Sequence, residues 1–251
     1  ERMLSIIDLF EGETPEWTAD ELLARLGYTR STLYRYLKVL TDHGFLTVLP
    51  DIGYTLGPRI IELDYKIRTR DRLILASIPA MVELVGEIAS IALLCRRYRD
   101  KVLCIHQERS TDQFQSNYER GKARPLLRGA ASRVILAHMS SNALTRLYQA
   151  QAPEFAAAGY GETLEDVREV LKGIRRAGFD VSVGHVTPGV TGVAAPLFDA
   201  RGTVIGSLSV TLGETNIGPE RLKFISDRVC FCARIVTKTL SRDQSDTKRV
   251  A

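Results

Sequence analysis

Hydroxyl, phenol and cationic side chains alternate with leucines in the stretch "YTRSTLYRYLKVLTDHGF", residues 28–45. At about 100° per residue, Leu33, Leu37 and Leu40 fall on one side of a helix. The opposite side carries Ser31, Arg35, Lys38 and Asp42, with Tyr34 and Thr41 on a flank. Hydroxyl groups suit phosphate oxygens, and arginine can make paired hydrogen bonds to guanine. The stretch therefore suits contact with DNA; the alternative is an ordinary core helix with a solvated outer face.

The neighbouring elements favour the first interpretation. Apolar residues at helical spacing predict a first helix that ends near residues 11–12. Thr18 and Glu21 form a T-x-x-E capping-box pattern, which predicts a helix that stops at Gly27. Thr29 or Ser31 can cap the next helix. The segment "LTVLPDIGYTLG" then predicts two short strands. Two helices, a short turn and a hairpin describe a winged helix-turn-helix, whose second helix fits a major groove roughly 12 Å wide.

Charge supports DNA contact only locally. The net charge of the chain is +4, and residues 1–70 carry nine Lys and Arg against eleven Asp and Glu. Between Leu22 and Thr41, however, four cations occur without a single acid. The overall acidity of the segment keeps a second hypothesis open, in which the winged helix makes only protein contacts.

The rest of the chain predicts a sheet surrounded by helices. The charged stretch "YKIRTRDR" marks a domain boundary near residues 66–72, and Pro79 begins or kinks a helix. "SIALLCRRYRDKVLCIHQE" reads as a hairpin, residues 130–149 as a helix, and "TLEDVREVLKGIRRAGF" as a helix capped by Thr163 and ended at Gly178. Three more strands and a final helix from Gly218 complete an α+β sensor-like domain of five or six strands.

The N-terminal residues resemble the DNA-binding segment of IclR-type bacterial transcriptional regulators, in which S-T-x-x-R is followed by a leucine-rich run, G-[YF]-[LV] and Y-x-L-G. The matching residues are Ser31, Thr32, Arg35, Gly44, Phe45, Leu46, Tyr54, Leu56 and Gly57. The resemblance implies DNA contacts from the recognition helix. The residues expected to make them are Arg30, Ser31, Thr32, Tyr34, Arg35 and Lys38.

The C-terminal half resembles the GAF-like effector domain of the same family, through "RPLLRGAASRVILAHMS", "IRRAGFDVS" and "GVTGVAAPLFDARGTVIGSLSV". Two departures leave the effector undefined. His185 lies in "VGHVTPG", where many members have a glutamate-rich segment, and Gly192 stands where many have cysteine. The effector-binding residues implied by the resemblance are Ser116, Ala130, Ala131, Ser182, Val190, Gly192, Ser209 and Thr211, to which we add His185 as a further donor.

The chemistry of these residues suits an organic acid. Small residues at the start of the "GAASRV" helix leave its free N–H groups open to a carboxylate. Ser209 and Thr211 alternate along a strand so that both point the same way, while Val190 and Phe114 would pack against an apolar group. Each residue also has an ordinary structural explanation, such as Ser209 bonding to neighbouring backbone.

An enzyme is the competing class. The four histidines are scattered, and the chain lacks G-x-S-x-G, H-E-x-x-H and G-x-x-x-x-G-K-[ST] motifs. The four cysteines show no zinc-like spacing and read as reduced thiols. We therefore expect no catalytic site, metal or cofactor. A membrane-spanning helix needs roughly 18 to 20 consecutive apolar residues, and no segment of the sequence approaches that length. A cytoplasmic location without membrane contact is therefore expected.

The sequence thus predicts a ligand-responsive transcriptional regulator, either repressor or activator, of a catabolic operon. Its expected partners are a near-palindromic double-stranded operator, a small organic acid and further copies of the chain, as a dimer or a dimer of dimers. The expected organisation is a winged helix-turn-helix over residues 1–65, a linker helix over 66–78, a GAF-like domain over 79–241 and a disordered tail over 242–251.

Overall fold

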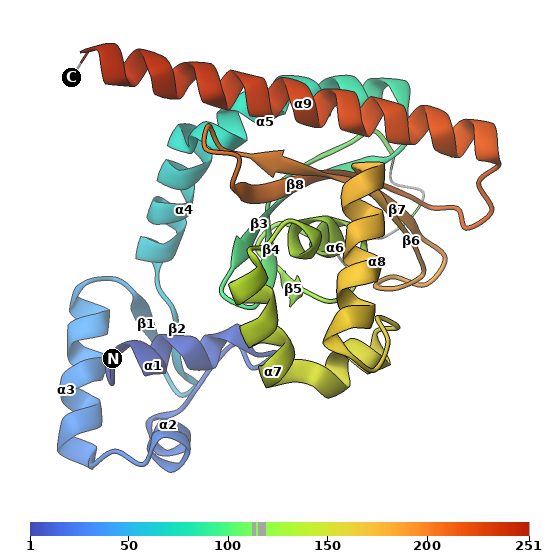
Figure 1. The fold of residues 1–251 in the computed structure, drawn as a ribbon. Helices are drawn as coiled ribbons and strands as arrows, with labels where there is room; N and C mark the ends of the chain where they lie inside the picture. Colours follow the sequence, from blue (N-terminus) through green and yellow to red (C-terminus); the bar gives the residue numbers. More distant parts are fainter. Residues whose placement is uncertain (112–113, 115–118, 251) are drawn as a thin grey trace. The chain divides into compact units, whose positions relative to one another are not determined.

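The computed structural model describes residues 1–111, 114 and 119–250, with the backbone alone given for 243–250. Contacts along the chain divide it into two compact units, Glu1–Asp71 and Arg72–Ala251 (Figure 1). The division falls inside the predicted linker. That linker is not one helix, because α4 ends at Arg70 and Asp71 is extended (φ −68°, ψ 119°) before α5 begins.

The first unit is a small helical domain with a hairpin. Its elements are α1 (Leu4–Asp8), η1 (Leu9–Glu11), α2 (Ala19–Leu26), α3 (Arg30–Asp42), β1 (Leu46–Leu49), β2 (Gly53–Leu56) and α4 (Pro58–Arg70). The leucine stripe Leu33, Leu37 and Leu40 of α3 is buried against Ile6 of α1 and Leu22 of α2. This confirms the predicted core side of the recognition helix.

Local signals set the helix ends of this unit. Thr18 accepts from the Glu21 N–H, and the Glu21 carboxylate accepts from the Thr18 N–H at 2.8 Å, which confirms the capping box. Gly27 ends α2 in the left-handed conformation at φ 65°. Of the two predicted caps for α3, Thr29 is the one used, because its side chain accepts from the Thr32 N–H.

The wing is a two-stranded antiparallel hairpin with Leu46 opposite Leu56. Gly57 must be glycine, since a Cβ there would overlap the carbonyl group of Gly44. Trp17, between η1 and α2, exchanges backbone hydrogen bonds with Tyr54 at 2.9 and 2.8 Å. The wing is therefore braced by the segment that precedes α2.

The second unit is built on one antiparallel sheet with the strand order β5-β4-β3-β8-β7-β6. Its strands are β3 (Ile91–Tyr98), β4 (Lys101–Arg109), β5 (Ala123–Pro125), β6 (Asp180–Val183), β7 (Thr191–Phe198) and β8 (Val204–Leu212). Its helices are α5 (Arg72–Glu87), α6 (Ala130–Ala137), α7 (Ser141–Ala157), α8 (Leu164–Ala177) and α9 (Pro219–Val250). The predicted α+β class is confirmed.

Helices cover both faces of the sheet, as the ribbon shows (Figure 1). Ala92 and Leu94 of β3 belong to the core formed with α5 and α9, whereas Leu93 and Cys95 belong to the core formed with α6 and α8. The alternation follows from the two-residue repeat of a strand. Burial on both faces explains why β3 begins as an uninterrupted apolar run.

Several predicted boundaries were wrong. Residues 130–149 are not one helix, because α6 ends at Ala137 and Ser140 starts α7 by accepting from the Ala143 N–H. Of the two alternatives predicted for Pro79, the start of a helix is excluded, because Pro79 lies inside α5. Residues 242–250, predicted as a disordered tail, continue α9. That continuation is consistent with a segment that lacks glycine and proline.

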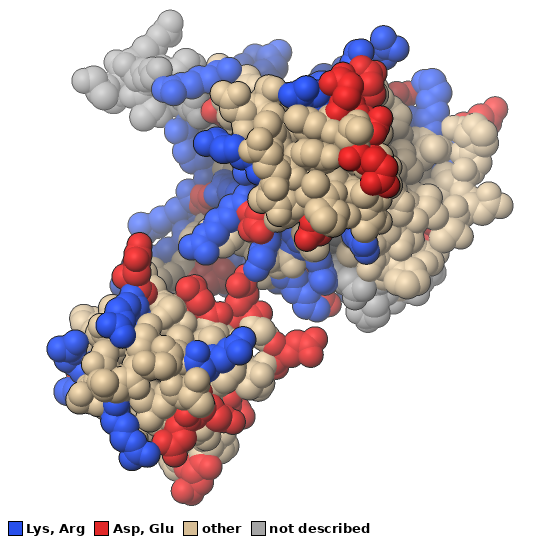
Figure 2. Space-filling view, turned by 60° about the horizontal axis from the view of Figure 1, so that its bottom comes forward, with Lys and Arg blue, Asp and Glu red and all other residues tan. Residues whose placement is uncertain are grey.

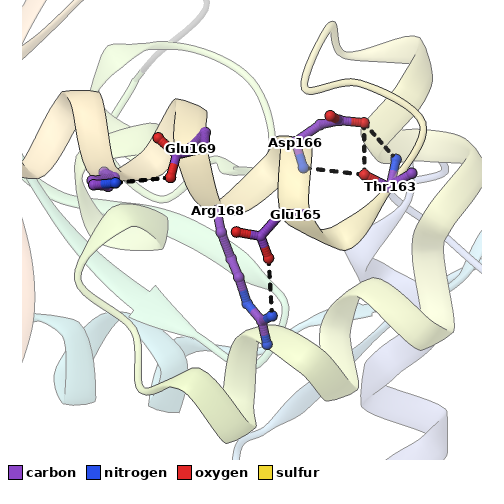
Figure 3. Close-up of polar contacts among 6 residues, drawn as sticks. Thr163, Glu165, Asp166, Arg168 and Glu169 are labelled. Carbon is purple, nitrogen blue, oxygen red and sulfur yellow. Dashed lines mark hydrogen bonds and ion pairs between the residues drawn. The ribbon is translucent and has the colours of Figure 1, made fainter.

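The α8 boundaries were predicted correctly. Thr163 accepts from the Asp166 N–H at 3.2 Å and the Asp166 carboxylate accepts from the Thr163 N–H at 2.9 Å (Figure 3). Gly178 ends the helix at φ 78°. The helix therefore delivers the chain directly into β6, which begins at Asp180.

Candidate functional site

The outer face of α3 holds most of the residues predicted to contact DNA. Ser31, Arg35 and Lys38 are exposed, and Tyr34 is 50% exposed. Thr32 is half-buried and its hydroxyl accepts from Thr29 Oγ1 at 2.9 Å. Thr32 is thus engaged in the start of the helix, while the other four side chains are open to a partner.

Ion pairing distinguishes the cations of this face. Arg30 lies 3.3 Å from Asp20, and Lys38 lies 3.0 Å from Asp42, with all four side chains largely exposed. Arg35 stacks over the Tyr36 ring at 5.4 Å and has no carboxylate partner among the described residues. Its guanidinium can therefore bind a base or a phosphate without first breaking an ion pair, unlike Arg30 and Lys38.

Opposite charges separate over the first unit. Figure 2 shows Lys and Arg gathered along one side of the smaller lobe and Asp and Glu along another. The near-zero charge of this segment therefore hides a local asymmetry, which is the quantity that matters for a polyanion.

The second predicted site surrounds a cavity at the β6 end of the large sheet, beside the start of α6. Its volume is about 30 Å³. The lining residues are Leu93, Gly129, Ala130, Ala131, Ser182, His185, Val186, Thr187, Val190, Gly192, Ser209 and Thr211. Of the nine predicted residues, Ser116 lies outside the described residues, and the structure brings the other eight together here. Their role in binding remains a prediction.

Strand register places three of these residues in one row. Ser182 of β6 is opposite Gly192 of β7, and Gly192 is opposite Thr211 of β8. A Cβ at Gly192 would lie 3.3 Å from Ser182 Oγ and 3.9 Å from the Ala130 Cβ. The missing side chain thus keeps space open between the sheet and α6.

Two serines give the cavity its polar character. The Ala130 N–H, at the start of α6, donates to Ser182 Oγ at 3.0 Å. Ser209 is 2% exposed, and its hydroxyl has no hydrogen-bond partner among the described residues. A buried unpaired hydroxyl costs roughly 1–3 kcal/mol. By contrast, Ser207 on the same strand donates to the Ala131 carbonyl at 2.8 Å.

A buried ion pair beside the cavity was missed by the sequence analysis. Arg133 Nε of α6 and Asp180 Oδ2 of β6 are 2.8 Å apart. Arg133 also lies over the ring of Tyr160, whose hydroxyl donates to the Leu127 carbonyl at 3.0 Å. Burial raises the pKa of Asp180, and the Arg133 charge opposes that rise. The sequence signal that could have indicated this pair is Asp180, a single acid at the start of a predicted strand.

The pair and the Ser182 contact act on the same two elements. Asp180 and Ser182 are two residues apart on β6, and both hold α6 near its N-terminus. The start of α6 is therefore fixed against the sheet at two points. Its N–H groups can receive a negative charge without the helix first becoming ordered.

Size limits what the cavity accommodates without movement. A volume of about 30 Å³ has room for roughly two water molecules. An organic acid needs more space than that, so the elements around the cavity would have to move apart for one to enter. Four further residues line the cavity and were not predicted: Leu93, Gly129, Val186 and Thr187. Val186 and Thr187 adjoin the predicted His185, whereas nothing in the sequence around Leu93 indicated a binding site.

Within the described residues, no group of three or more His, Cys, Asp or Glu is placed to hold a metal ion. The helices of the same residues include none that is both long and apolar enough to cross a membrane.

A winged helix-turn-helix followed by an antiparallel sheet domain with a polar cavity defines the class of two-domain transcriptional regulators. Family models identify the particular branch. The IclR helix-turn-helix domain matches residues 1–50, and the model of the bacterial transcriptional regulator IclR C-terminal domain matches residues 67–238. The chain belongs to the IclR family of bacterial transcriptional regulators.

Individual relatives are distant but span the chain. The HTH-type transcriptional regulator KipR of Bacillus subtilis is 24% identical over 95% of both proteins. The structure of an IclR regulator from Alicyclobacillus acidocaldarius matches with a TM-score of 0.77 at 23% identity, covering 96% of this chain and 97% of that one. An IclR homologue from Microbacterium hydrocarbonoxydans, solved with 4-hydroxybenzoate, matches with a TM-score of 0.76 at 20% identity, covering 95% and 97%.

Proposed function

We propose that this regulator binds a near-palindromic operator through α3 and releases or strengthens that binding when a small organic acid occupies the cavity beside α6. The observation that carries the proposal is the unpaired, buried Ser209 hydroxyl at the cavity. A hydroxyl that finds no partner within the protein is stabilised when a ligand oxygen accepts from it. The nearby N-terminus of α6 favours a negatively charged ligand group.

The residues take distinct roles in this proposal. Ser182, Ser209 and Thr211 hydrogen-bond the acidic or hydroxyl end of the ligand. Ala130 holds the Ser182 hydroxyl in place through its N–H, and the N–H of Ala131 faces the charge of the ligand. Val190 contacts the apolar part, His185 closes the cavity from the turn, and Gly192 sets the width. Because Gly192 and His185 depart from common family residues, we propose that they set which acid is accepted.

On the DNA side, Arg35 reads a base edge, while Ser31, Tyr34 and Lys38 contact the backbone. Arg30 joins the backbone contacts and Thr32 supports the helix start. Two chains present two copies of α3 to two half-sites, as a dimer or a dimer of dimers in the cytoplasm. The genes controlled belong to a catabolic operon, a proposal that rests on family resemblance.

Two measurements on the full chain test the proposal. Gel shifts with DNA flanking the gene should reveal one specifically bound site, and the affinity for that site should fall as the salt concentration rises. Thermal shifts with benzoate, 4-hydroxybenzoate and short aliphatic acids should identify a stabilising ligand by mass action. That ligand should then change operator affinity, because only differential binding to the two states couples the sites. No specific DNA site at low salt, or a ligand without effect on DNA binding, would contradict the proposal.

A further inference from the structure

A second and larger cavity lies on the α9 side of the sheet, bounded by β7 and the C-terminal ends of α6 and α8. Its volume is about 650 Å³, against about 30 Å³ for the cavity beside the start of α6. Small-molecule sites in proteins commonly occupy roughly 300–1,000 Å³. The volume of this cavity, which is open to solvent on one side, falls within that range.

The inner lining of this cavity is apolar and partly aromatic. Ala195, Pro196 and Ala233 are buried, while Phe179 and Phe198 are half-buried. Aromatic and aliphatic surface of this kind binds a flat apolar body through buried area.

Cations surround that apolar surface. Arg175, Arg234 and Lys238 all line the cavity. One Arg175 nitrogen already donates to the Ala137 carbonyl at 2.8 Å, which orients the guanidinium. Arg234 and Lys238 have no carboxylate partner among the described residues. Asp227 also lines the cavity, but its carboxylate is already paired with Lys223 at 2.7 Å. A ligand anion would therefore meet two cations that are not engaged by that acid.

Three other cations of α9 offer a contrast. Lys223 pairs with Asp227 at 2.7 Å, and Arg221 pairs with Glu214 at 2.8 Å. Arg228 is held by the carboxylates of Glu83 and Glu87. The unpaired cations Arg234 and Lys238 thus coincide with the cavity, whereas the three paired ones are absent from its lining.

His138 adds a hydrogen-bonding group of defined type. Its Nδ1 lies 2.8 Å from the Val134 carbonyl, so this nitrogen carries the proton. Burial lowers the pKa of His138, and the ring packs edge-to-face on Phe198 at 5.1 Å. A neutral ring with Nδ1–H leaves Nε2 as an acceptor, which suits a hydroxyl of the ligand.

We propose that this cavity is a second ligand site, for an organic carboxylate with a flat, preferably aromatic, body. The anion lies between Arg234 and Lys238, and the body lies against Phe179 and Phe198. The site is separate from the cavity beside the start of α6 and does not depend on the function proposed for it.

Isothermal titration of the full chain with sodium benzoate, in low-chloride buffer, tests the proposal. Wild type should show binding that survives Gly192→Leu, a change that fills the other cavity. The double variant Arg234→Ala/Lys238→Ala should bind benzoate at this second site at least about tenfold more weakly, as expected for lost charge-assisted hydrogen bonds. Crystals soaked in 4-bromobenzoate should show bromine between α9 and β7.

The matched control is Lys172→Ala/Arg221→Ala, which removes the same charge from two exposed ion pairs, with Glu169 and Glu214, that do not line the cavity. It should leave benzoate affinity within about twofold, because long-range effects of exposed charges are screened by salt. Equal weakening in both double variants would overturn the proposal, and so would loss of all binding in Gly192→Leu. If Arg234→Ala/Lys238→Ala changes the sedimentation of the protein but not benzoate binding, the cavity is a contact between copies and the proposal fails. Should that variant misfold, Lys238→Glu, a surface charge reversal, replaces it with the same expected weakening.

Discussion

At the scale of single residues, the base contact proposed for Arg35 can be tested by substitution. Replacement by alanine should cost roughly 1–3 kcal/mol at the operator and less on unrelated DNA, because a bidentate contact to guanine is specific. Arg35→Lys keeps the charge but loses the planar fork, so it should retain non-specific affinity and lose discrimination. Competitive gel shifts against random DNA measure both quantities. If the two substitutions weaken both kinds of DNA equally, Arg35 contacts only phosphate.

Ser207 and Ser209 provide a matched pair for the cavity. Both lie buried on β8, but among the described residues only Ser207 has a hydrogen-bond partner, the Ala131 carbonyl. Ser207→Ala should therefore lower the free energy of unfolding by about 1 kcal/mol. Ser209→Ala should leave stability unchanged or slightly raised, while it weakens ligand binding by roughly tenfold. Denaturant unfolding and ligand titration separate the two effects; a clear loss of stability in Ser209→Ala would assign that hydroxyl a structural role.

At the scale of elements, the capping box of α8 links stability to pH. Thr163→Ala should cost about 1 kcal/mol, as removal of an N-cap usually does. Hydrogen bonds from the Thr163 side chain and backbone lower the pKa of Asp166, so the ionised carboxylate is favoured in the folded state. The capping box therefore contributes its full stability at pH values above the pKa of Asp166 in the unfolded chain. This contribution is lost as the pH falls through the lower pKa of Asp166 in the folded protein. Urea unfolding of both proteins from pH 7 down to pH 3 should show the difference between them shrinking; a constant difference would contradict this account.

Disruption of the wing should affect the first unit and leave the second unit unchanged. A Cβ at Gly57 would overlap the Gly44 carbonyl, so Gly57→Ala must displace the hairpin or the start of α4. We expect lost operator binding with unchanged ligand-induced stabilisation of the second unit, measured by differential scanning calorimetry. Gly86→Ala, where a Cβ meets nothing within 4 Å, is the control and should leave DNA binding intact.

At the scale of the whole molecule, salt dependence counts the phosphates that the protein neutralises. The logarithm of operator affinity should fall linearly with the logarithm of salt concentration, with a slope of about −0.9 for each phosphate contacted. Lys38→Ala should reduce that slope by about one for each α3 that binds, and it should weaken all DNA sequences alike. If Lys38→Ala changes the base preference and leaves the salt-dependence slope unchanged, Lys38 contacts a base and not the DNA backbone.

Much of the fold follows from the sequence because its signals are local. Helix periodicity gave the buried side of α3, the T-x-x-E pattern and the Thr163 cap gave the starts of α2 and α8, and glycines gave their ends. Alternation and turn residues predicted five of the six strands of the large sheet. Each of these signals depends on residues within a few positions of one another, so neighbouring side chains and backbone dihedrals are sufficient to produce them.

Other features required the tertiary structure. Ala130 and Ser182 meet across 52 residues, and Arg133 meets Asp180 only because strand register and helix packing bring β6 under α6. The break between α6 and α7 was missed because apolar periodicity continues through it while a side-chain cap at Ser140 decides the boundary. The sequence by itself determined which residues could form a recognition helix and an anion site. Tertiary packing decided that the Ser209 hydroxyl lacks a hydrogen-bond partner within the described part of the chain. It also decided that one cavity is narrow and the other wide, because volumes and unpaired groups depend on every element around them.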